Sequence, residues 1–337
     1  MAAIRTEVTE IVTGLAMLGY RELKQALEVR PGHILNVGSE HFDRLEAALQ
    51  AGRHSQEFET AWSNGQAFGR SVDGLRGRPP WHIEWKGPHR PPGYEQIPAD
   101  LRIDHVYLVS CKYGSSILHN SSPTHLFDRG LAERRVERGA DWFLETAPEA
   151  YQALYRAYCS ELGLDAMPAN VSELDRASRD RIKAASSRGK WPGACEPAAR
   201  EFALAVAQES ANRWTGALTA PAQREEMLWR LLRLQAAPYF VLGADLAGEP
   251  LRYRVGTPWD FRESFRLRSF DAWADPAGQP LVRWRADVVD RRSDSRRIVE
   301  GHVEIRWSHG RFSGAPEAKV HLDTPPHAVA GYVPLAT

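Results

Sequence analysis

The sequence predicts a mixed α/β (α+β) protein with a central mixed sheet, flanking helices and a β-rich C-terminal part. Some stretches carry apolar residues at helical spacing, and other short runs alternate apolar and polar residues. The two kinds of stretch are segregated along the chain, which argues against a regularly alternating wound fold. The composition, 43% apolar and 26% charged, is typical of a globular protein with a substantial core.

The N-terminal part predicts helices and one short strand. Ile11, Leu15 and Leu18 recur at helical spacing, and Pro31-Gly32 ends that pattern. We expect a strand at 33–37 and helices at 4–28, 41–50 and 56–69.

Three strand-like runs follow a Gly/Arg/Pro loop. A second loop, residues 87–98, joins the first two runs and is too rich in Pro and Gly to be helical. Asp104-His105 is expected to close a tight hairpin between the second and third. The three runs are residues 81–86, 100–103 and 106–113.

The second half predicts a long helical stretch, a buried strand and then the β-rich part. The strand is the apolar run at 239–243, and from about residue 250 the period changes to two. We therefore divide the chain into a region at 1–245, with a helical N-terminus, a core and a helical insertion at about 123–220, and a β-rich region at 246–337. The helical segments are expected at 123–160, 172–187, 197–213 and 222–235.

Charge and cysteine usage narrow the class of protein. The 43 basic and 43 acidic residues cancel, which excludes a uniformly basic surface but not a local basic groove. Cys111, Cys159 and Cys195 are far apart and lack metal-ligand spacing, as expected in a reducing cytoplasm. No signal-peptide pattern and no long apolar window is present, so we expect no membrane association.

Acids and lysines gather at the ends of the three strand-like runs. Glu84 and Lys86 lie on the first, Asp100 precedes the second, and Ser110 and Lys112 share one face of the third. A lysine that continues a largely apolar strand is costly unless it is paired or used. Carboxylates hold hard cations, and a neighbouring lysine stabilises negative charge, which are the needs of phosphodiester hydrolysis.

The run Pro98-Ala99-Asp100, a hairpin and then residues 106–112 resembles the core of the PD-(D/E)xK nuclease superfamily. That restriction-endonuclease-like core consists of a helix, a three-strand meander, a helix and a strand. The resemblance implies that Asp100 is the metal-binding aspartate and Lys112 the catalytic lysine, with Mg²⁺ or Mn²⁺ as cofactor. The elements that correspond to it are residues 56–69, the three strands, 222–235 and 239–243.

One position departs from the motif, because Ser110 stands where the second acid is expected. Glu84 on the neighbouring strand is the natural replacement as catalytic residue and metal ligand, and Glu59 is another candidate. Lys86 and His119 are secondary candidates. The resemblance implies a metal-dependent nuclease acting on nucleic acid, DNA above all, in defence or repair.

Two other registers satisfy the acid-x-lysine rule outright, which the register with Ser110 does not. Asp73 precedes Glu84-Trp85-Lys86, and Glu317-Ala318-Lys319 lies in the C-terminal strands. We prefer Asp100 with Lys112 because a continuous apolar strand carries the lysine. Asp73 instead lies in a Gly/Arg loop, which is poorly suited to rigid positioning.

The C-terminal region carries arginines between aromatic residues. One interpretation is a nucleic-acid face, with arginines for phosphates and aromatics for stacking. The other is a solvated surface balanced by interspersed acids. An alternative function is therefore a non-catalytic nuclease-like module that binds DNA, or a protein partner through this region, and Ser110 favours it. The arginines in question are Arg283, Arg285, Arg306 and Arg311.

Overall fold

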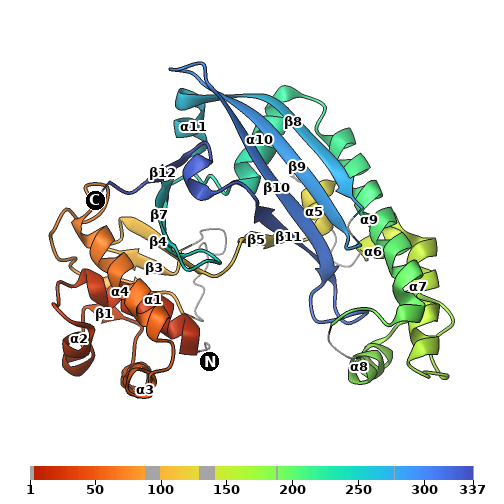
Figure 1. Cartoon of the computed structure of the whole chain (residues 1–337), viewed down its shortest axis with the longest axis horizontal. Coiled ribbons are helices and arrows are strands. Elements are labelled where there is room, and N and C mark those ends of the chain that lie inside the picture. The colour runs from red at the N-terminus through yellow and green to blue at the C-terminus, as the bar shows by residue number, and fades with distance from the viewer. Residues whose placement is uncertain (1–3, 88–98, 129–140, 187–188, 277, 337) are drawn as a thin grey trace. The chain divides into compact units, whose positions relative to one another are not determined.

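The computed structural model describes residues 4–87, 99–128, 141–186, 189–276 and 278–336 (Figure 1). It has the predicted α+β class, with a mixed sheet of parallel and antiparallel strands flanked by helices. The chain forms two compact units, each with a sheet of its own. The first comprises Met1–Ser116, Arg233–Ser264 and Pro325–Thr337, and the second Ile117–Leu232 and Phe265–Thr324.

These units differ from the predicted division near residue 245. The helical insertion and most of the β-rich part share one sheet, because β5 (Ile117–Ser121) pairs with β11 (Pro316–Leu322). Two later strands, β7 (Pro250–Val255) and β12 (Tyr332–Pro334), instead extend the first sheet. No strand was predicted from the sequence for the residues around His119, which pair with β11 as β5.

The first unit is built on a seven-stranded sheet in the order β1-β2-β3-β4-β6-β7-β12. Strands β2, β3 and β4 form the predicted antiparallel meander, and β6 lies parallel to β4. These strands are β1 (Ile34–Leu35), β2 (Ile83–Trp85), β3 (Leu101–Ile103), β4 (Tyr107–Tyr113) and β6 (Tyr239–Ala244).

The hairpin between β3 and β4 confirms the predicted turn. Asp104 and His105 have φ of 50° and 57°, the left-handed conformation that two-residue hairpin turns require. The Asp104 carboxylate also accepts hydrogen bonds from the backbone N–H of Trp81 (2.7 Å) and His82 (3.1 Å). The turn is therefore tied to the segment that enters β2.

Helices α1 and α4 pack against the first sheet and form its core with it. The helix expected at 4–28 is interrupted, because Gly19 has a φ of +85° and a second helix begins after it. The helices expected at 41–50 and 56–69 are confirmed. The helices of this unit are α1 (Ile4–Met17), α2 (Leu23–Val29), α3 (Ser39–Gln50), α4 (Ser55–Arg70) and α11 (Pro258–Ser264), with the 3₁₀ turn η3 (Pro326–Ala328).

The second unit is built on a five-stranded antiparallel sheet in the order β5-β11-β10-β9-β8. The period-two pattern is confirmed there, because Val303 and Ile305 are fully buried while the residues between them are not. The remaining strands are β8 (Phe265–Asp275), β9 (Leu281–Asp290) and β10 (Arg296–Trp307).

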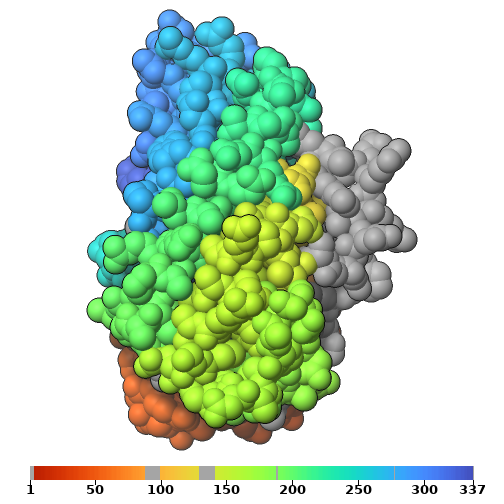
Figure 2. All heavy atoms as spheres, turned by 90° about the vertical axis from the view of Figure 1, so that its right-hand side faces the viewer, coloured from red at the N-terminus to blue at the C-terminus, as the bar shows by residue number. Residues whose placement is uncertain are grey.

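Helices cover one face of this second sheet, with α9 in contact with β8 and β9. Figure 2 shows the helical side of this unit, where yellow-green and green segments form the surface. The helical stretch is confirmed where the structure describes it; residues 129–140 lie outside the described part. The elements are α5 (Pro123–Phe127), α6 (Trp142–Thr146), α7 (Pro148–Glu161), η1 (Val171–Glu173), α8 (Arg176–Ala185), η2 (Gly193–Cys195), α9 (Glu196–Ala217) and α10 (Pro221–Leu231).

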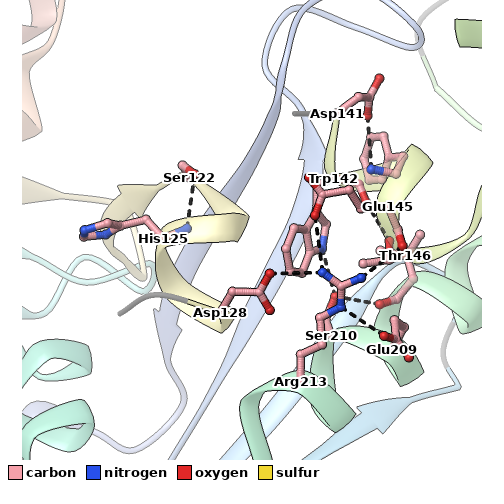
Figure 3. A network of polar contacts seen from close by, with 12 residues as sticks. Ser122, His125, Asp128, Asp141, Trp142, Glu145, Thr146, Glu209, Ser210 and Arg213 are labelled. Carbon is pink, nitrogen blue, oxygen red and sulfur yellow. Dashed lines mark hydrogen bonds and ion pairs between the residues drawn. The ribbon is translucent and has the colours of Figure 1, made fainter. Parts of the chain in front are cut away.

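An arginine network connects three of these helices (Figure 3). Arg213 of α9 bonds Asp128 at 3.0 Å, Glu145 at 3.3 Å and Glu209 at 2.9 Å. Its guanidinium also lies over the Trp142 ring, 5.0 Å from the centroid. The charge of the arginine is thus matched by acids within the network, so we interpret the network as structural.

Candidate active site

Asp100 lies directly before β3 and is held by the neighbouring strand β4. Its backbone N–H donates to the Val109 carbonyl at 2.8 Å. Its carboxylate oxygen Oδ2 accepts from the Cys111 backbone N–H at 2.7 Å and from the Ser110 hydroxyl at 3.3 Å. The Asp100 carboxylate thus takes the place of the backbone carbonyl that a longer β3 would have offered to Cys111. This bond holds the carboxylate at the end of the β3–β4 hydrogen-bond ladder.

Lys112 follows on β4, two residues beyond Ser110 and therefore on the same strand face. Burial lowers the pKa of its ammonium group, and the negative charge of Asp100 opposes this shift. The charge of Asp100 therefore acts on the ammonium group of Lys112. The anomaly noted in the sequence, a lysine on an apolar strand, is explained by a carboxylate that partly offsets the cost of burying it.

A third titratable group, Glu10 of α1, interacts electrostatically with this pair. Trp85 Nε1 donates to Glu10 Oε2 at 2.6 Å. Burial, and then the negative charge of Asp100, raise the pKa of Glu10 to about 8, while Lys112 and Lys86 oppose the shift. Glu10, Asp100 and Lys112 therefore form one electrostatically coupled cluster, which we call the carboxylate–lysine cluster.

Sequence reasoning missed Glu10. Its distance in sequence from Asp100, 90 residues, conceals any relation between the two. The one signal in the sequence is that Glu7 and Glu10 lie next to the apolar residues Val8 and Ile11 of the predicted helix. Of the two acids, Glu7 is paired with Arg44 at 2.8 Å, which leaves Glu10 as the acid directed at the cluster.

Glu84, the second acid that the sequence predicted, is paired with an arginine. Glu84 is the cross-strand partner of Arg102, whose Nε donates to its carboxylate at 2.6 Å. Glu59 is exposed on α4. We therefore replace Glu84 by Glu10 as the carboxylate that accompanies Asp100.

Two further cations act on the cluster. Lys86 follows β2, and its backbone N–H donates to the Asp100 carbonyl at 2.9 Å. Its charge acts on Glu10 and opposes the rise in the pKa of that group. Arg233, which the sequence did not single out, has a φ of 54° after α10 and helps to lower the pKa of Lys112 through its charge.

The donor set suits a hard divalent cation. Two carboxylates placed together repel each other, and this repulsion adds to the effect of burial on the pKa of Glu10. Mg²⁺ is commonly held by one or two carboxylates together with substrate phosphate oxygens. In the part of the chain that the structure describes, no group of three or more His, Cys, Asp or Glu side chains is placed to hold a metal. Glu10 and Asp100 are the residues that would hold such a cation, and substrate and water would have to supply its other ligands.

The other candidates lie outside the cluster. His119 belongs to β5 of the second unit. Asp73 is in the loop after α4, where its backbone N–H bonds the Ser71 hydroxyl. In the C-terminal match, Glu317 is paired with Lys319 at 3.2 Å and also with Arg306.

The four arginines of the second unit that the sequence singled out are engaged by acids or carbonyl groups. Arg283 pairs with Asp275 and with Asp323, Arg285 with Glu300 at 3.5 Å, and Arg306 with Glu304 at 3.4 Å. These pairs favour the charge-balanced solvated surface over the nucleic-acid face. Arg311 lies over the Trp191 ring, 3.9 Å from its centroid, and donates to the Gly189 carbonyl.

Comparison of the chain with protein-family models, with curated proteins and with solved structures gives no match. The site is therefore argued from its own residues. No helix in the described residues combines the length and the apolar character needed to cross a membrane.

Proposed function

We propose that the first unit is a metal-dependent nuclease that hydrolyses phosphodiester bonds, with DNA as the favoured substrate. The observation that carries the proposal is the carboxylate–lysine cluster at the start of β3. The element order around it, a helix, a three-strand meander and a strand parallel to the third, agrees with the resemblance to the PD-(D/E)xK superfamily. A role in defence or repair rests on that resemblance alone.

In this proposal Glu10 and Asp100 hold the cation through carboxylate oxygens. A bound Mg²⁺ or Mn²⁺ polarises a phosphate oxygen and makes water a better nucleophile at neutral pH. Ser110, which stands where the motif has an acid, donates its hydroxyl hydrogen to Asp100 and so helps to orient that carboxylate. The missing acid of β4 is thus replaced by one from α1.

Lys112 donates from its ammonium group to a non-bridging phosphate oxygen and offsets the charge that develops there. Its burial strengthens this interaction, because a charge in a medium of low dielectric constant acts more strongly than one in water. The lowered pKa also brings the group closer to accepting a proton from the attacking water.

The alternative is a non-catalytic nuclease-like module that binds DNA or a partner. The observation in its favour is that Ser110 stands where the motif has an acid, and its hydroxyl donates to Asp100. It predicts nucleic-acid binding without any cleavage that depends on a divalent cation.

A cleavage assay with Mg²⁺ or Mn²⁺ on linear, circular and single-stranded DNA and on RNA separates these functions. We expect Lys112→Ala, Asp100→Asn and Glu10→Gln each to lower the rate by roughly 10²-fold or more, the usual cost of losing a charge-stabilising group. Glu28→Gln, at an exposed position on α2, is the control and should cut like the wild type. Glu84→Gln tests whether Glu10, and not Glu84, is the carboxylate that acts with Asp100; in that case this variant should cut like the wild type.

Two outcomes contradict the proposal. Cutting at the wild-type rate by all three cluster variants would remove the cluster from the mechanism. Binding without any cutting by the wild type would support the accessory module instead.

A further inference from the structure

A groove lies at the C-terminal ends of α1 and α4 in the first unit. It has a volume of about 560 Å³. Three arginines line it, Arg21, Arg70 and Arg78, and no carboxylate is among its described lining residues. In a chain with equal numbers of acids and bases, such a one-sided lining indicates an anionic ligand.

The walls of the groove are open to a ligand. Gly19, Gly69 and Gly77 all line it, and a Cβ built on any of them would meet nothing within 4 Å. Apolar side chains of Met17 and Pro79 complete the lining. The groove therefore offers charged, backbone and apolar surface together, which suits a ligand with phosphates and flat apolar rings.

The positive charge of the groove exceeds the negative charge of the groups next to it. The C-terminal end of a helix carries about half a negative charge, and Arg70 lies in the last turn of α4. Arg78 is paired with Asp104 at 3.3 Å. After both helix ends and Asp104 are counted, the groove remains positive. Arg76, exposed in the same loop, adds to that charge.

An exposed tryptophan adjoins this charge. Trp81 is 82% exposed, and Val106 in the nearby hairpin is 70% exposed. The carboxylate of Asp104 accepts from the Trp81 backbone N–H at 2.7 Å and also bonds Arg78. A single turn residue thus holds both the backbone of Trp81 and the guanidinium of Arg78, an arginine of the groove. Aromatic rings next to cations are the usual means of binding single-stranded nucleic acid.

We propose that the groove and Trp81 bind a single strand of nucleic acid, with phosphates on Arg21, Arg70 and Arg78 and a base stacked on Trp81. The inference deepens the proposed nuclease function and rests on it for the identity of the polymer. Glu10 and Met17 lie on the same helix, about 10 Å apart along its axis. A single strand usually occupies a site of about 4 to 16 nucleotides, which is long enough for one strand to reach both the groove and the cluster.

The test measures binding without cleavage. The full chain carrying Lys112→Ala is titrated against a fluorescein-labelled oligothymidylate of about twelve nucleotides, within the usual site size for a single strand, and anisotropy is recorded at several salt concentrations. Trp81→Ala should weaken binding about tenfold, the effect expected when one base no longer stacks, and Trp81→Phe should restore most of it. The Arg21→Gln/Arg70→Gln double variant should reduce the salt slope by about 0.7 for each phosphate that is no longer neutralised.

Matched controls come from the same unit. Trp259→Ala removes a tryptophan that is 69% exposed on α11, and Arg53→Gln removes an exposed arginine before α4. Both should leave binding unchanged. Equal losses of affinity in the controls and in the groove variants would overturn the inference. Displacement of the labelled oligonucleotide by polyglutamate, as effective as displacement by unlabelled oligonucleotide, would also overturn it and would indicate an acidic protein partner.

The result also separates this inference from the proposed function. Cleavage by the wild type combined with unchanged binding in the groove variants would reject the groove alone. Binding that depends on Trp81 in a protein that cuts nothing would support the groove and reject the nuclease.

Discussion

At the scale of single residues, Glu10 gives the most direct test of the cluster. Its pKa is raised from 4.5 to about 8, mainly by burial and then by Asp100. The folded chain therefore keeps a proton that the unfolded chain loses above pH 4.5. The free energy of unfolding should fall as pH rises between about 5 and 8, because the unfolded state is the less protonated one in that range.

Glu10→Gln should remove this contribution while keeping a carbonyl acceptor for Trp85 Nε1. We expect the variant to gain stability relative to the wild type as pH increases, with little difference at about pH 5 and the largest at about pH 9. Urea unfolding at these two pH values and at neutral pH, without divalent cations, measures it. A difference independent of pH would show that Glu10 ionises normally, and Glu28→Gln controls for the loss of a surface charge.

At the scale of elements, the sequence predicted the parts of the first sheet that depend on local pattern. The meander, the Asp104-His105 turn and the apolar strand at 239–243 were all readable, because alternation and turn chemistry act over a few residues. Asp100 and Lys112 were selected as candidates from the same local patterns. Glu10 was not selected, since its hydrogen bond with Trp85 depends on the packing of α1 on β2.

The packing of α1 on α4 makes a second prediction. Gly65 lies at their contact, where a Cβ would come within 2.2 Å of the Thr13 carbonyl oxygen and 2.7 Å of the Ala16 Cβ. Gly65→Ala should therefore cost about 1 to 3 kcal/mol of stability by overpacking, although alanine favours helices. Chemical denaturation measures the change.

Gly69→Ala in the same helix is the matched control. A Cβ there meets nothing within 4 Å, so only the helix propensity changes, and the variant should gain up to about 1 kcal/mol. Equal effects at both positions would contradict the close approach of α1 and α4.

At the scale of the whole molecule, the chain crosses repeatedly between units that each have a separate sheet. Strand β5 (Ile117–Ser121) joins a sheet whose other strands begin only at Phe265, which is why the predicted division at 245 differs from the observed units. Local patterns carry no information on such distant pairing. Only the requirement that every strand find a hydrogen-bonding partner and a covered face decides it.

Because each unit has its own sheet, we expect a destabilising substitution in one unit to lower the stability of that unit alone. Arg213→Ala removes the bonds to Asp128, Glu145 and Glu209 and should cost the second unit roughly 2 kcal/mol, as expected for charge-assisted hydrogen bonds. Arg176→Ala in the same unit removes an exposed arginine and should cost less than about 0.5 kcal/mol.

Native-state hydrogen exchange resolves where the stability is lost. Arg213→Ala should reduce the protection of amides in β9 and β10 while those of β4 and β6 keep theirs, and Gly65→Ala should do the reverse. The physical reason is that the apolar contacts of each sheet are made within its own unit. If both variants lowered protection equally in all four strands, the chain would unfold as one cooperative body, and the carboxylate–lysine cluster would then depend on the second unit for its stability.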